Sequence, residues 1–140
     1  MSTDEIAALS LAEAAEKIAS KEISSLEATE VALDRIGRYG AKLLAIVRCD
    51  GDAAIEAAKG ADADLAAGKV RGPLHGVPLA HKDMYYRAGW TAACGSNILA
   101  DYVPDVTSTA IVRLDEAGAL DIARLNMVEF AFGPTGHNDV

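Results

Sequence analysis

One lysine in this sequence follows a short apolar run and could serve as a base. Lys82 follows His81 and the run Val-Pro-Leu-Ala at 77–80, which is typical of a short or edge strand because proline cannot donate to a ladder. Enclosure at a strand end disfavours the charged form of an amine, and a neutral amine can accept a proton near neutral pH. The alternative is a surface lysine paired with Asp83 or another carboxylate.

The histidines and cysteines do not predict a metal site or a second nucleophile. His75, His81 and His137 match no zinc-ligand spacing, and Cys49 and Cys94 form no CxxC motif. We interpret the histidines as turn or surface residues, with His81 placed to influence the charge at Lys82. We expect no metal and no organic cofactor.

The charge balance argues against two classes of partner. The chain has 13 Lys and Arg against 21 Asp and Glu, a formal net charge of −8, which disfavours direct binding of nucleic acid or an anionic membrane surface. The acidic start does not resemble a signal peptide, and no apolar run reaches the roughly 18 residues of a membrane span. We therefore expect a cytoplasmic protein with free thiols.

The first 70 residues predict alanine-rich helices around a modest core. Ser24 and Glu27 stand in capping-box spacing and indicate a helix start. The run at 43–47 fits either a strand or a buried helical turn. The expected helices cover three segments: 4–20, 24 to Gly37 or Gly40, and 52–67.

The second half predicts a parallel crossover unit and hence the α/β class. It contains a strand at 77–80, a long loop at 84–106, a helix from Thr107 or Ser108 to Ala117, and a strand at 119–123. We expect one domain over residues 1–140, with a helical front part at 1–70 and a lysine-bearing part at 71–140. Functional side chains in such sheets gather at the carboxyl ends of strands, where Lys82 and Asn126-Met127 fall.

An ordered series of short motifs resembles the amidase signature family over residues 71–138. No single motif decides the resemblance; their order along the chain does. The series consists of Gly72-Pro73-Leu74-His75-Gly76-Val77-Pro78, Lys82-Asp83, Cys94-Gly95-Ser96, Val103-Pro104-Asp105, Ala117-Gly118-Ala119 and Asn126-Met127-Val128-Glu129-Phe130.

The resemblance implies hydrolysis or transfer of carboxamide groups by a lysine and two serines. Lys82 matches the lysine of that triad, and Met127 matches a position that lines the substrate site, although a gap-filling core methionine is an equal alternative. The family's serines lie in a Gly/Ser-rich stretch beyond the Asn-Met-x-Glu-Phe segment. We therefore expect an incomplete amidase domain that is inactive alone.

Five further residues test this interpretation. Ser96 follows Lys82 in the loop but lacks the strained elbow of a catalytic serine. Asp121 stands in a strand that is typically apolar in the family, so it must be paired, exposed at an edge, or a sign of a degraded gene product. Asn126 is expected to cap a short helix at Glu129, and Phe130 and Phe132 are expected in the core.

Two other functions stay open beside the amidase hypothesis. The chain could be a non-catalytic module that binds a ligand or partner through the aromatic loop 84–106. It could also belong to an A-type amidotransferase subunit, which acts on aminoacyl-tRNA. The expected partners are a small amide substrate in the full-length enzyme and, through an uncovered sheet edge, a second copy or another protein.

Overall fold

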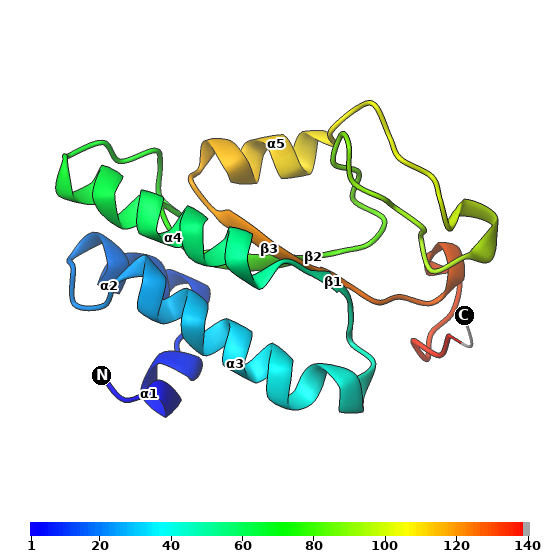
Figure 1. Ribbon diagram of the computed structural model, residues 1–140, viewed down its shortest axis with the longest axis horizontal. Coiled ribbons are helices and arrows are strands. Elements are labelled where there is room, and N and C mark those ends of the chain that lie inside the picture. Colours follow the sequence, from blue (N-terminus) through cyan, green and yellow to red (C-terminus); the bar gives the residue numbers. More distant parts are fainter. Residues whose placement is uncertain (139–140) are drawn as a thin grey trace.

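The computed structural model describes residues 1–138, in which helices lie on both sides of a small sheet (Figure 1). The elements are α1 (Thr3–Ala7), α2 (Leu11–Ala19), α3 (Ser25–Leu43), β1 (Ile46–Cys49), α4 (Gly51–Ala66), β2 (Pro78–Lys82), η1 (Asn97–Leu99), α5 (Thr109–Glu116), β3 (Leu120–Leu125) and η2 (Glu129–Ala131). The predicted α/β class is confirmed. None of the helices within residues 1–138 has the length and apolar character needed to cross a bilayer.

The chain begins with two short helices where the sequence predicted a single helix over 4–20. Ser10 separates them with an extended backbone, at φ −69° and ψ 164°. Its hydroxyl accepts a hydrogen bond from the Glu13 N–H at 3.3 Å, and the Glu13 carboxylate accepts one from the Ser10 N–H at 2.8 Å. This capping box starts α2 anew, so the prediction of one helix is wrong.

Helix α3 begins as predicted but continues past both glycines that were expected to end it. The Ser24 hydroxyl and the Glu27 side chain form the predicted capping box, with bonds of 2.9 and 2.7 Å. The helix then includes Gly37 and Gly40 and is capped by Leu44 in the left-handed region, at φ 51°. Glycine within a helix costs about 1 kcal/mol, which the packing of this long helix on the sheet outweighs.

The sheet has the strand order β1-β3-β2. Strands β2 and β3 are parallel and are joined through α5, which is the predicted crossover unit. The front part adds β1, which pairs antiparallel to β3. The run at 43–47 is thus divided between the end of α3, its cap and the start of β1.

A β-bulge in β3 changes which of its side chains share a face. The register against β2 passes from Asp121 directly to Ala123, so Ile122 is the additional residue. Side chains alternate along a regular strand, and one additional residue shifts that alternation. Asp121 and Arg124, three positions apart, therefore lie on the same face.

The buried apolar residues form two clusters. The first joins α4 to β3 through Ala54, Ala58, Leu120, Ile122 and Ala123, and its alanines let the helix lie close to the strand. The second joins the front helices to the start of β2 through Ile18, Ile23, Ala28 and Val77. Because alanine contributes little buried area, the first cluster is modest.

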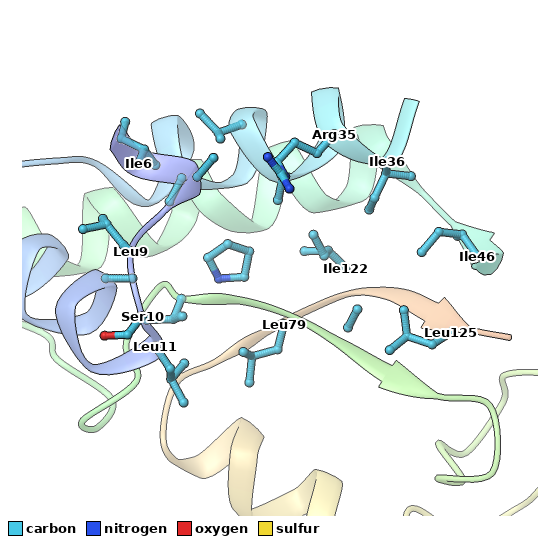
Figure 2. Close-up of a pocket in the computed structure, with 18 residues that line it drawn as sticks. Ile6, Leu9, Ser10, Leu11, Arg35, Ile36, Ile46, Leu79, Ile122 and Leu125 are labelled. Carbon is cyan, nitrogen blue, oxygen red and sulfur yellow. The ribbon is translucent and has the colours of Figure 1, made fainter. Parts of the chain in front are cut away.

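An apolar pocket of about 480 Å³ lies between the front helices and the sheet (Figure 2). Ile6 and Leu9 line it beside α1, Ile36 lines it from α3, and Leu79 and Ile122 line it from the strands. Leu125 at the end of β3 also lines this pocket, but the two predicted site residues, Lys82 and Met127, do not.

Candidate functional site

The carboxyl ends of β2 and β3 bring the two predicted site residues to one edge of the sheet. Lys82 ends β2 and pairs in register with Leu125, which ends β3. Met127 follows two residues later and is 5% exposed. Parallel strands place such residues at a common edge, where ligands of α/β proteins bind.

The Lys82 side chain is half-buried and is not neutralised by its neighbour. Within residues 1–138, no carboxylate oxygen lies within 4.0 Å of its Nζ atom. The Asp83 carboxylate is directed instead to the backbone N–H of Cys94, at 3.1 Å. The interpretation of Lys82 as a surface lysine paired with Asp83 therefore does not describe this structure.

Asp83 is a buried carboxyl group at the junction of three segments. Its backbone N–H donates to the Leu125 carbonyl at 3.1 Å and continues the parallel ladder by one residue. Burial raises the pKa of Asp83, while hydrogen bonds from the backbone of Ala93 and Cys94 and the charge of Arg124 oppose the rise. Asp83 therefore holds the loop and is not the ion-pair partner of Lys82 that was offered as an alternative.

The turn that Asp83 contacts has a constrained backbone. Cys94 and Gly95 both adopt positive φ, at 54° and 66°. A Cβ atom at Gly95 would lie 2.5 Å from the Met127 carbonyl oxygen, so the site requires glycine. The Cys94 carbonyl also accepts a hydrogen bond from the Phe130 N–H at 2.9 Å. The turn at 94–95 is thus packed directly against the segment that follows β3.

Ser96 is buried and hydrogen-bonded to Glu129. Its Oγ atom donates to Glu129 Oε1 at 2.6 Å and accepts from the Ile98 N–H at 3.2 Å. No hydrogen bond joins Ser96 to Lys82 in the part of the chain that the structure describes. The Ser96–Glu129 bond connects the loop to the Asn-Met-x-Glu-Phe motif, a link that the spacing alone did not indicate.

Asn126 fixes the path of the chain beyond β3. Its Oδ1 atom accepts from the Met127 N–H at 2.8 Å, and its Nδ2 atom donates to the Leu44 carbonyl at 3.0 Å. Asn126 therefore does not cap the η2 turn, and that prediction is wrong. The prediction of a core position is also wrong for Phe130 and Phe132, which are 49% and 92% exposed, because φ of 48° at Phe130 breaks the helical path.

A cluster of charges explains the unexpected carboxylate in β3. Arg124 donates two hydrogen bonds to Asp121, at 2.7 and 2.9 Å. Arg87 donates a third through Nε at 2.8 Å and also binds Asp115 of α5 at 2.8 and 2.9 Å. Of the three alternatives for Asp121, pairing is the one found. Because a buried carboxylate needs cationic partners, the position of Asp121 in a buried strand could have indicated that an arginine such as Arg87 binds it.

Trp90 and His81 complete this cluster. The guanidinium carbons of Arg48, Arg124 and Arg87 lie 4.3, 4.9 and 5.4 Å from the Trp90 ring centre, which is cation–π range. His81 Nε2 lies 3.9 Å from an Asp121 oxygen. Burial lowers the pKa of His81. The charge of Asp121 opposes this shift, whereas the charges of Arg124 and Arg87 add to it. His81 thus faces the charge cluster of Asp121.

The histidines do not gather as metal ligands. His75 is buried, with Nδ1 accepting from the Arg71 N–H at 3.2 Å and Nε2 donating to the Ala61 carbonyl at 2.9 Å. Over residues 1–138, no group of three His, Cys, Asp or Glu side chains is placed to hold a metal ion.

Comparison with known proteins identifies the family. The Amidase family matches residues 27–140, and the chain belongs to it. It is 43% identical over 129 residues to the A-type subunit of glutamyl-tRNA(Gln) amidotransferase from Aromatoleum aromaticum, covering 92% of this chain and 26% of that protein. The chain thus spans about a quarter of the length of this curated relative.

Solved structures agree with the fold. One crystal structure of an amidase superimposes with a TM-score of 0.85 at 35% identity and covers 94% of this chain and 30% of its own. The native peptide amidase from Stenotrophomonas maltophilia gives a TM-score of 0.79 at 30% identity, covering 89% of this chain and 26% of its own. The predicted resemblance to the amidase signature family is confirmed.

Proposed function

We propose that this chain forms the lysine-bearing part of an enzyme that hydrolyses or transfers carboxamide C–N bonds. The observation that carries the proposal is the position of Lys82. It lies half-buried at the carboxyl end of a parallel strand, with the carboxylate of its neighbour bound elsewhere, in a chain of the amidase family.

In the proposed mechanism, Lys82 is the general base of a Lys–Ser–Ser triad. Its amine takes a proton from a bridging serine, which takes one from the nucleophilic serine. The nucleophilic serine then attacks the amide carbonyl, and the proton taken up by Lys82 returns through the bridging serine to the departing amine. Water or another amine then releases the acyl group from the serine. Both serines would come from sequence C-terminal to the Asn-Met-x-Glu-Phe motif, and Met127 would line the substrate site. The mechanism requires no metal and no organic cofactor.

The alternative of an amidotransferase subunit has one specific observation in its favour. The curated relatives from Aromatoleum aromaticum and Geobacter sulfurreducens, at 43% and 40% identity, are both named as the A-type subunit of glutamyl-tRNA(Gln) amidotransferase. In that role the same lysine-bearing site would release the amide group of a donor for transfer to aminoacyl-tRNA. A stand-alone amidase would release ammonia without a second subunit.

The non-catalytic alternative is less well supported by the loop that motivated it. Tyr86 and Tyr102 pack on each other with ring centres 5.5 Å apart, and Trp90 is engaged by arginines. These aromatic side chains hold the loop together.

We further propose a cytoplasmic setting, since Cys49 and Cys94 are free thiols. We also propose that the chain is a single incomplete domain whose outer sheet edges can associate with further protein.

The test is an assay of ammonia release from glutamine and from a simple carboxamide. The 140-residue chain should be inactive, whereas the longest natural protein that carries this sequence should be active. Activity with carboxamides alone supports a stand-alone amidase, and activity that depends on a partner subunit supports the amidotransferase. Turnover by the 140-residue chain that is lost in Lys82→Ala but persists in Ser96→Ala would contradict the proposed source of the nucleophile.

A further inference from the structure

One buried carboxylate links three of the motifs that frame the candidate site. Asp83 is 5% exposed and adjoins Lys82. Its Oδ2 atom accepts a hydrogen bond from the Cys94 N–H at 3.1 Å. Its backbone N–H is bound to Leu125, so the residue is fixed on the sheet while its side chain reaches the loop.

The turn at 93–96, which receives this hydrogen bond, is itself in contact with the segment that carries Met127. The Cys94 carbonyl accepts from the Phe130 N–H at 2.9 Å, and the Ser96 hydroxyl donates to Glu129 at 2.6 Å. Gly95 lies against the Met127 carbonyl with no space for a Cβ atom. A displacement of the turn would therefore displace the segment that contains Met127.

We propose that Asp83 is a positioning residue, whose carboxylate holds the 93–96 turn and through it the Met127–Phe130 segment in register with Lys82. The inference rests on the proposed function, because the site between these segments is the proposed amide site. The contact itself is a property of the 140-residue chain and can be tested without any activity.

The backbone conformation of the turn explains why a carboxylate is needed there. Cys94 and Gly95 both have positive φ, and for Cys94 this conformation is costly for a residue with a side chain. A buried N–H without an acceptor would add a further penalty. The Asp83 oxygen removes that penalty, so the turn is stable only while an acceptor is present at this place.

Two cysteines provide a direct readout of the turn. Cys94 is buried in it, and Cys49 is exposed at the end of β1 and serves as an internal reference. The experiment measures alkylation of each thiol by iodoacetamide in the 140-residue chain, by peptide mass spectrometry. Each rate is divided by its value in denaturant, so that the ratio reports how strongly the fold protects that thiol. The variants are Asp83→Ala, Asp83→Asn and, as a matched control in the same loop, Asp101→Ala.

The expected result is slow alkylation of Cys94 in the unsubstituted chain, at least roughly tenfold faster alkylation in Asp83→Ala, and unchanged protection in Asp101→Ala. Asp83→Asn keeps an acceptor oxygen and should restore most of the protection, which a general loss of packing would not allow. Protection retained in Asp83→Ala, or Cys94 as reactive as Cys49 in the unsubstituted chain, would overturn the proposal. Absence of amidase activity would contradict only the proposed function.

Discussion

Asp121 and Arg124 lie three positions apart on one strand and nevertheless form a two-point ion pair, with bonds of 2.7 and 2.9 Å. A regular strand would place them on opposite faces. The bulge at Ile122 brings them to the same face, where Arg87 reaches the same carboxylate from the loop. A buried charge in the sheet is thereby neutralised, and the loop is bound to β3 and α5 at one point.

This arrangement predicts that a single substitution in the ion pair lowers the free energy of unfolding more than substitution of both partners does. Arg124→Leu should lower the free energy of unfolding by about 3 kcal/mol, because it leaves the Asp121 carboxylate with fewer partners in a buried place. The double variant Asp121→Leu with Arg124→Leu should recover most of that loss. Chemical denaturation monitored by circular dichroism measures both.

An exposed pair provides the control for this comparison. Arg38 and Asp34 form an ion pair at 3.2 Å on the surface of α3, so Arg38→Leu should change the free energy of unfolding by only about 0.5 kcal/mol. Equal effects of Arg124→Leu and Arg38→Leu would show that the buried cluster does not bind the loop to β3 and α5 as described above.

Two glycines with similar backbone angles should respond differently to alanine. Gly95 and Gly89 have φ of 66° and 78°, but a Cβ atom at Gly95 would meet the Met127 carbonyl, whereas Gly89 faces open space. Gly89→Ala should cost about 1 kcal/mol from backbone conformation alone. Gly95→Ala should cost about 3 kcal/mol, because the steric conflict is added. Thermal unfolding of both variants measures the difference, and similar midpoints would refute it.

His81 should make the protein less stable as the pH falls. Its folded-state pKa is lowered mainly by burial, so the unfolded chain binds the proton more readily. The contribution of His81 is fully present above its ordinary pKa of 6.5 and is lost as the pH falls from there through the lowered value. His81→Gln should remove this part of the pH dependence in denaturation curves. An unchanged dependence would mean that His81 is freely protonated in the fold.

Asp83 should make the protein less stable as the pH rises. Burial raises its folded-state pKa, so the folded chain holds the proton more tightly than the unfolded chain. Its contribution is present below the ordinary pKa of 3.8 and is lost as the pH rises through the raised value. Asp83→Asn should flatten the stability profile above pH 3.8 relative to the unsubstituted chain. Identical profiles for the variant and the unsubstituted chain would contradict the burial of an ionisable carboxyl group at this position.

The sequence predicted the elements better than the contacts between them. The strand–helix–strand unit and the positions of Lys82 and Met127 at strand ends followed from local patterns. The single helix over 4–20 was predicted from apolar spacing alone, whereas Ser10 and Glu13 form a capping box that starts a new helix. The bulge that pairs Asp121 with Arg124 and the bond from Asp83 to the loop depend on register and on long-range packing, which local patterns do not encode.

The central claim is that Lys82 is the base of an amide-cleaving site, and substitution of this lysine tests it most directly. In the longest natural protein that carries this sequence, Lys82→Met should lower kcat for carboxamide hydrolysis by at least about 100-fold, with the fold unchanged by circular dichroism. Lys69→Met, on the exposed segment before β2, should retain full activity. A Lys82→Met protein that hydrolyses amides at the unsubstituted rate would contradict the account.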